Sequence, residues 1–222
     1  MAPRASLWAA ARYSLADMRL NSSVSVEYVI AAFLHAELQS PRWGKYYDEG
    51  ISANGFDRSI VESPQLENPV ENDARRTLLR WVRGYPDERL FIRFPNDVSW
   101  CTGVADAQDI ASFRYGNYDD WVALSNHTGL VGEAAKTLDR DDLVTKVNVA
   151  QVRGDAEAIR RGGLTDPVIV VSRAADTPMV ILDGCCRTTA LALAGTDGPA
   201  TVEVILGISP SMVDWYWWPP GL

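Results

Sequence analysis

Seven consecutive residues near the C-terminus carry the side chains best suited to chemistry: Asp183, Gly184, Cys185, Cys186, Arg187, Thr188 and Thr189. A β-branched run precedes them and an Ala- and Leu-rich run follows, which predicts a strand, a glycine turn and the start of a helix. The N–H groups of Cys186, Arg187 and Thr188 would then face outward at the positive end of the helix, where anions bind. The guanidinium of Arg187 is a bidentate partner for phosphate, and the hydroxyls of Thr188 and Thr189 are further donors. This segment therefore predicts an anion site.

The acid and the thiols of this turn suggest catalytic roles. We expect Asp183, at the end of the strand, to act as a base or to hold a metal ion. A cysteine beside an arginine at a helix N-terminus usually has a lowered pKa, so Cys185 is expected to be nucleophilic. The alternative interpretation is that Cys185 and Cys186 are small buried residues that fill the turn.

A set of spaced motifs covers residues 143–208, about the last third of the chain: G-L-x-x-P-[IV]-x-V, then [IV]-x-D-G-x-x-R-x-x-A, then A-G and V-x-V. This pattern resembles the ParB/sulfiredoxin-like superfamily, which includes ParB partition proteins, sulfiredoxins and free-serine kinases. The resemblance implies a nucleotide pocket whose turn from Gly184 to Arg187 holds phosphates, with Pro167 from the first motif beside it. The serine kinases also use a glutamate near the first strand, for which Glu157 is the nearest candidate.

The chain departs from each branch of that superfamily. The serine kinases carry Asp-Gly-His-His-Arg where this chain reads Asp-Gly-Cys-Cys-Arg, so both histidines are replaced. Sulfiredoxins carry Gly-Gly-Cys-His-Arg, which aligns Cys185 with their catalytic cysteine. ParB proteins carry Gly-Glu-Arg-Arg and usually continue into a helix-turn-helix domain, whereas about fifteen residues follow the last predicted strand here. The whole chain, through blocks 94–100 and 208–212, also resembles a group of actinobacterial proteins, which implies no activity.

Helical periodicity dominates the first half of the chain. Apolar spacing predicts a helix from residue 26 to about residue 40, with Ser25 as its N-cap, and another over 72–83. The Gly-, Pro- and Asn-rich stretch 43–69 predicts a loop with at most a short helical turn. A short capped helix is expected over 106–113.

The second half predicts strands alternating with helices. We expect strands at 144–149, 168–171, 179–182 and 201–206, and helices at 155–161 and 188–194. The fold class is therefore α+β. A helical, aromatic-rich N-terminal region (1–140) would pack on a C-terminal α/β module (141–222) that has a small mixed sheet, is ParB/sulfiredoxin-like by resemblance, and ends in a Trp-rich tail that docks on the body or on a partner.

Composition and charge exclude several classes of protein. The chain has 222 residues, of which 47% are hydrophobic and 23% charged, so disorder over most of its length is excluded. A net charge of −8 disfavours DNA and anionic membranes as partners, and no apolar run approaches the ~18 residues of a membrane span. Three cysteines, two of them adjacent, form a poor disulfide framework and predict a reducing cytoplasm. Neither His35 nor His127 has zinc-ligand spacing to a partner.

Together, the residues and the resemblance predict a nucleotide-dependent enzyme of small-molecule metabolism. The leading hypothesis is a phosphotransferase that uses ATP, ADP or another nucleotide with Mg²⁺, with Asp183 as base or magnesium ligand. The N-terminal region would supply the acceptor pocket, and a homo-oligomer is left open. One alternative is a non-catalytic nucleotide-sensing or interaction module, favoured by the replaced histidines. The other is sulfiredoxin-like thiol chemistry at Cys185.

Overall fold

The computed structural model describes residues 19–138, 140, 143–163, 166–199 and 201–222, and within them the strands form one mixed sheet. The strand order is β1-β2-β6-β4-β5-β3, with β4 parallel to β6 and β3 parallel to β5. The strands are β1 (Arg19–Ser23), β2 (Ser99–Ala105), β3 (Arg114–Tyr115), β4 (Val168–Ser172), β5 (Val180–Asp183) and β6 (Val202–Ile208).

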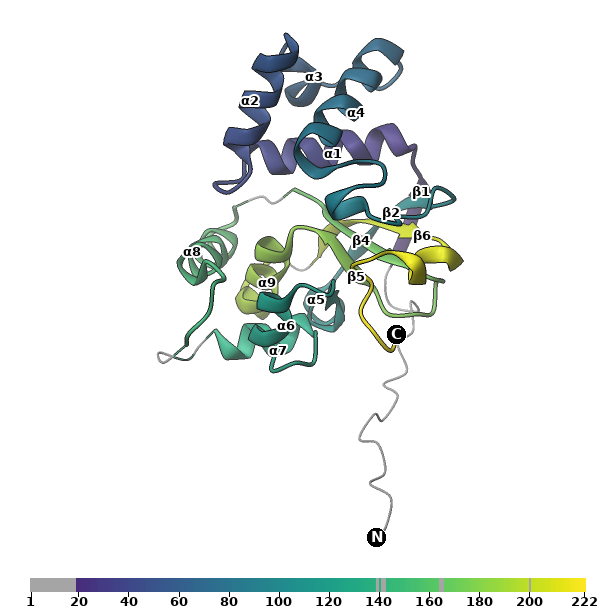
Figure 1. The fold of residues 1–222 in the computed structure, drawn as a ribbon. Coiled ribbons are helices and arrows are strands. Elements are labelled where there is room, and N and C mark those ends of the chain that lie inside the picture. The colour runs from purple at the N-terminus through teal and green to yellow at the C-terminus, as the bar shows by residue number, and fades with distance from the viewer. Residues whose placement is uncertain (1–18, 139, 141–142, 164–165, 200) are drawn as a thin grey trace.

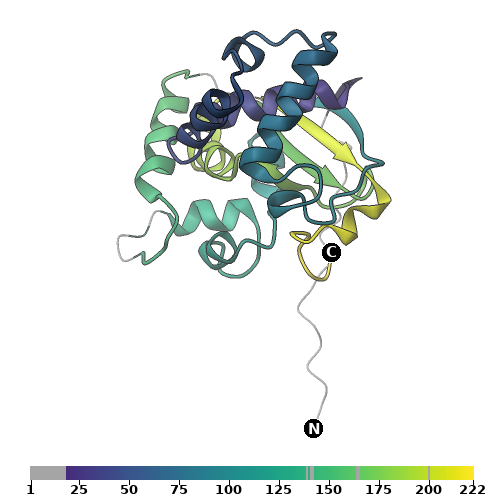
Figure 2. The same ribbon diagram turned by 45° about the horizontal axis from the view of Figure 1, so that its top comes forward.

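Helices cover both faces of this sheet (Figure 1). The first layer contains α1 (Val26–Leu38), α2 (Gly44–Asn54), α3 (Ser59–Glu62) and α4 (Pro69–Arg83). The second contains α5 (Ala107–Ser112), α6 (Asp119–Leu124), α7 (Val131–Thr137), α8 (Val149–Arg160) and α9 (Cys185–Ala194). Short 3₁₀ helices are η1 (Arg89–Phe91), η2 (Gly195–Asp197) and η3 (Pro210–Asp214). Figure 2 shows the same layers with the first turned toward the viewer.

Side chains of β4 and β5 alternate between two hydrophobic cores, as the two-residue period of a strand requires. Ile169 and Leu182 belong to the core beneath α1–α4, whereas Val168, Val170 and Ile181 belong to the core beneath α5–α9. All residues of β4 and β5 are buried. This double burial explains the uninterrupted β-branched run and confirms the predicted strands.

Strands from both halves of the chain share the sheet. β2 lies before residue 140, yet it pairs antiparallel with β6 from Ser99 opposite Ile208 to Ala105 opposite Val202. The N-terminal region therefore contributes strands as well as helices. The expected α+β class is confirmed, with helices in the N-terminal region packed against a mixed sheet.

Local capping signals identified several helices correctly. Ser25 caps α1 by accepting from the N–H of Tyr28, and Gly84 ends α4 in a left-handed conformation. Asp106 forms a capping box with Asp109 at the start of α5. The Trp-rich tail packs on the body of the protein, where the buried Trp215 donates from its indole N–H to the carbonyl of Leu90 at 2.7 Å.

Two predicted elements are wrong. The expected loop over 43–69 contains α2 and α3, because buried residues such as Tyr47 and Ile51 hold α2 against the body despite its glycines. The expected strand over 144–149 is absent from the described residues of that range; Asn148 instead caps α8 by accepting from the N–H of Gln151. Among the described residues, no helix combines the length and apolar character that crossing a membrane requires.

Candidate functional site

The predicted strand, glycine turn and helix form as expected at the end of β5. Gly184 is the N-cap of α9 and has a φ of 92°, the left-handed region that favours glycine. A Cβ on Gly184 would also lie 2.8 Å from an Nη atom of Arg187. The backbone conformation therefore favours glycine here, and a side chain at this position would also force the guanidinium of Arg187 to move.

The hydroxyls of Thr188 and Thr189 form hydrogen bonds within this turn. Thr188 donates to the carbonyl of Gly184 at 2.8 Å, and Thr189 donates to the carbonyl of Cys185 at 2.6 Å. Both residues are fully buried, and Thr189 also bonds the hydroxyl of Tyr115 at 2.7 Å. Because these hydroxyls already bond the protein, we no longer expect Thr188 and Thr189 to donate to a phosphate.

Arg187 joins the turn to the loop before β4. Its Nη2 donates to the carbonyl of Pro167 at 3.0 Å and to a carboxylate oxygen of Asp183 at 3.3 Å. Its Nη1 lies 3.7 Å from Asp166, whose other oxygen is 2.9 Å from Nδ1 of His35 on α1. The structure thus brings together Pro167, Asp183 and Arg187, which the sequence had grouped, and adds Asp166 and His35.

A second acid, Glu37 of α1, lies beside Asp183. Glu37 and Asp183 are only 4% and 8% exposed. The hydroxyl of Tyr47 donates to Glu37 at 2.9 Å, and Nε of Arg83 lies 3.5 Å from the same oxygen. Burial raises the pKa of Glu37 to about 8; Arg83 opposes this rise, and the nearby Asp183 adds to it by charge and hydrogen bonding.

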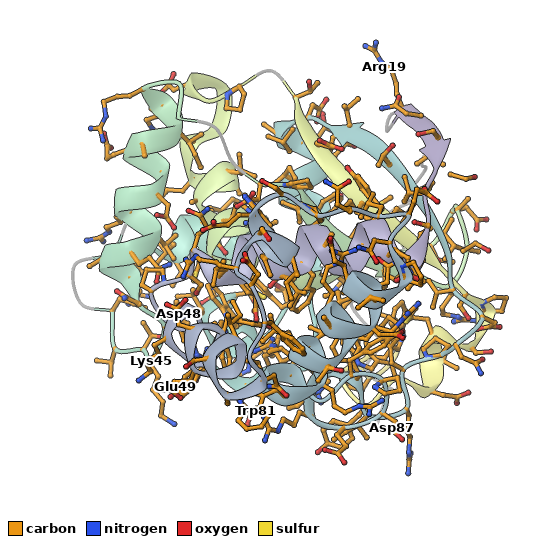
Figure 3. All side chains as sticks on the ribbon, turned by 90° about the horizontal axis from the view of Figure 1, so that it is seen from above. Arg19, Lys45, Asp48, Glu49, Trp81 and Asp87 are labelled. Carbon is orange, nitrogen blue, oxygen red and sulfur yellow. The ribbon has the colours of Figure 1, made fainter. Side chains whose placement is uncertain are left out.

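The contrast between inner and outer sides of this layer is visible on α2. Lys45, Asp48 and Glu49 extend to the outer surface (Figure 3), whereas Tyr47 between them is completely buried.

Sequence reasoning missed Glu37, although a signal existed. The apolar positions 26, 29, 30, 33 and 34 are followed at the same helical spacing by 37, so an acid occupies an inward-facing position.

Several buried polar atoms in this cluster lack a hydrogen-bond partner among the described residues. They include Nε of Arg83, Nε of Arg187 and the hydroxyl oxygen of Tyr118. Charges of Cys185, Arg83, Asp183 and Glu37 all act on the Tyr118 hydroxyl, whose pKa is raised chiefly by burial. Buried polar atoms without partners are rare, and these three belong to residues that interact with Glu37 or Asp183.

The lowered pKa expected for Cys185 is wrong. Burial raises the pKa of its thiol well above the ordinary value, and it raises the pKa of Cys186 to about 11. The charge of Arg83 acts against this rise at Cys185, and that of Arg187 acts against it at Cys186, but burial outweighs both. The alternative interpretation, that both cysteines fill the turn, fits the structure better.

Glu157 is not part of the turn. Its side chain is 58% exposed and pairs with Arg160 at 2.6 Å, and Arg160 also donates to the carbonyl of Leu193 near the C-terminal end of α9. The turn lies at the opposite end of α9. The acid that α8 brings near the turn is Asp155. Its negative charge raises the pKa of Cys186, and the positive charge of Arg187 acts to lower the pKa of Asp155.

The side chains present fit a phosphate better than a resident metal ion. Within the described part of the chain, no group of three or more His, Cys, Asp or Glu residues could hold a metal. Asp183, the expected magnesium ligand, is paired with Arg187. By contrast, the start of α9 and the guanidiniums of Arg83 and Arg187 are groups that bind phosphate oxygens. We therefore expect Asp183 to act as a base rather than as a magnesium ligand.

Comparison of the chain with protein-family models, with curated proteins and with solved structures found no match.

Proposed function

We propose that the protein is a phosphotransferase that transfers the terminal phosphoryl group of a nucleotide to a small-molecule acceptor at the turn 183–187. One observation carries this proposal: two arginines, Arg83 and Arg187, converge with two buried carboxylates, Glu37 and Asp183, at the start of α9. Phosphoryl transfer requires mainly positioning and neutralisation of charge, and this cluster supplies groups for both.

The arginines and the carboxylates would have different roles in the reaction. The guanidiniums of Arg83 and Arg187 would bind the phosphate oxygens. The acceptor hydroxyl oxygen would form a bond to the terminal phosphorus while the bond from that phosphorus to the nucleotide's bridging oxygen breaks. The acceptor's proton would pass to Asp183, and the shortened nucleotide would leave with the electron pair of the broken bond.

Glu37 contributes through its protonation state. Because its pKa is raised to about 8, its carboxyl keeps a proton at neutral pH. The pair of acids then carries less negative charge, which reduces its repulsion of a phosphate group. The free thiols of Cys101, Cys185 and Cys186 suit a reducing cytoplasm, where we expect the protein to act.

Calorimetric titration with ATP, ADP, CTP and GTP, each with magnesium, tests the proposal. We expect one nucleotide to bind the wild type and Arg58→Ala equally, since Arg58 is an exposed ion-paired arginine remote in sequence from the turn. Arg187→Ala should bind at least about tenfold more weakly, because a charge-assisted contact to phosphate is lost. Phosphorus NMR would then detect the phosphorylated acceptor. Equal binding by wild type and Arg187→Ala, or no binding at all, would contradict the proposal.

A second candidate is a non-catalytic nucleotide-sensing module. It is favoured by the contacts that already hold Arg187 to Asp183, Asp166 and Pro167, because they leave its guanidinium less free to follow a reacting phosphate. Binding that Arg187→Ala weakens, with no phosphorylated product over hours, would support this function instead.

A further inference from the structure

A solvent-open cavity of about 560 Å³ lies on the opposite half of α1 from Glu37. It is enclosed by α1, the loop 85–98, the start of β2 and Leu182 of β5. Its wall is apolar, whereas the exposed residues Ser23, Asn96 and Ser99 lie at its mouth. The principal wall residues are Val29, Ile30, Phe33, Leu79, Phe91 and Trp100.

The wall of this cavity is held in place by specific packing. A Cβ at Gly207 of β6 would lie 2.6 Å from the ring of Trp100, so only glycine lets this ring lie against the sheet. Phe91 meets Tyr85 and Phe94 edge-on, with ring centroids 5.2 and 5.4 Å away. These contacts fix four aromatic side chains around one space.

The loop that forms one side of the cavity is also backbone-strained. Arg89 and Arg93 have φ values of 51° and 56°, in the left-handed region that non-glycine residues rarely adopt. The guanidinium of Arg89 secures this conformation by donating to the carbonyl of Val82 at 2.9 Å. Strain of this kind is retained where the surrounding structure shapes a ligand site.

We propose that this cavity binds a neutral small molecule with an apolar body and one hydrogen-bonding end. Its volume is within the range of roughly 300–1,000 Å³ that small-molecule sites occupy. Among the described residues that line it, none is charged. A charged ligand would lose its hydration without compensation, whereas an apolar body would contact the aromatic wall. Ser23, Asn96 and Ser99 offer hydrogen bonds at the mouth. The site is distinct from the turn 183–187 and does not depend on phosphoryl transfer.

The neutral dye N-phenyl-1-naphthylamine, whose fluorescence rises in apolar surroundings, provides the test with the full chain. We expect saturable binding of one dye per chain by the wild type. Val29→Phe places extra carbon in the cavity and should weaken binding at least about tenfold. Val26→Asp, at the first position of α1, should do the same by placing a carboxylate at the cavity edge.

Val70→Asp is the matched control. It makes the same change in the first turn of α4, at a residue that is 76% exposed and does not line the cavity. Because an acid suits a helix N-terminus, both aspartate variants should fold, so Val26→Asp remains informative even if Val29→Phe does not fold. Arg187→Ala should bind the dye as the wild type does. The proposal is overturned if the wild type shows no saturable binding, if Val26→Asp binds the dye as tightly as Val70→Asp, or if Arg187→Ala abolishes binding.

Discussion

The two halves of α1 cover two different kinds of space. Its N-terminal half, with Val29 and Phe33, faces the apolar cavity, whereas its C-terminal half brings Glu37 to Arg83 and Asp183. A single helical turn separates Phe33 from Glu37. An apolar side chain needs only close packing to be buried, but a buried acid needs a proton or a partner. The acid at the polar end of α1 is therefore surrounded by polar partners, whereas the side chains at the apolar end contact aromatic rings.

The largest effect is expected at the polar end. Asp183→Asn keeps the shape of the side chain but removes its capacity to accept a proton, so the rate of phosphoryl transfer should fall by about 10²–10⁴-fold. Asp48→Asn, an exposed change on α2, should leave the rate unchanged. Phosphorus NMR of the product measures both. An unchanged rate in Asp183→Asn, with its fold intact, would remove this residue from the mechanism.

Substitutions at the apolar end of α1 should change the free energy of unfolding. Phe91 is 3% exposed and contacts Phe33, Tyr85 and Phe94 through their rings, so Phe91→Ala should lower the free energy of unfolding by about 3–5 kcal/mol. Trp81→Ala removes a larger ring that is 52% exposed and should cost no more than about 1 kcal/mol. Urea unfolding compares them. Equal losses would show that the packing around the cavity is not rigid.

The pH dependence of stability separates the two ends further. The pKa of Glu37 is about 8 in the folded protein, above the ordinary value of 4.5, so the folded chain holds a proton that the unfolded chain releases. Its contribution is complete below pH 4.5 and is lost as the pH rises toward 8, by up to about 1.4 kcal/mol per pH unit.

Glu37→Gln should remove this slope while retaining a partner for Tyr47. Denaturant unfolding at several pH values between 5 and 8 measures it. Glu62→Gln, which replaces an exposed acid of α3, should keep the wild-type slope. If Glu37→Gln also keeps that slope, the pKa of Glu37 is not raised.

The smallest effect is expected at the thiol. Burial raises the pKa of Cys185, so the turn does not present a reactive thiolate. Cys185→Ser should therefore change the rate of phosphoryl transfer by less than about twofold, given that the role of Cys185 is packing. Loss of turnover in Cys185→Ser, with preferential iodoacetamide labelling of Cys185 in the wild type, would instead favour thiol chemistry.

The sequence predicted well those features that depend on neighbouring residues. The turn at Gly184 and the cap at Ser25 follow from local backbone chemistry, and both have the expected form. β2 was missed because its Cys, Thr and Gly residues hide the alternation of a strand, and its partner β6 is about 100 residues away. Glu157 was misplaced because the resemblance fixes only an approximate register. Asp155, two residues earlier, lies on a different face of α8 and is the acid that Arg187 attracts.

The full cluster could not be predicted because it joins distant segments. Arg83 ends α4 and Tyr47 lies within a stretch that reads as a loop, and only the packing of the first helical layer brings them to Glu37. Sequence spacing contains no information on that packing. The position of Glu37 in the apolar pattern of α1 was the one local sign of it.

Phosphoryl transfer at the turn 183–187 is best tested by a crystal structure of the chain grown with the nucleotide that binds most tightly. We expect the phosphates to lie at the start of α9, within hydrogen-bond distance of the guanidiniums of Arg187 and Arg83, with the carboxylate of Asp183 beside the terminal phosphate. Phosphates bound elsewhere on the protein, with Arg187 still paired to Asp183 and Pro167, would contradict it.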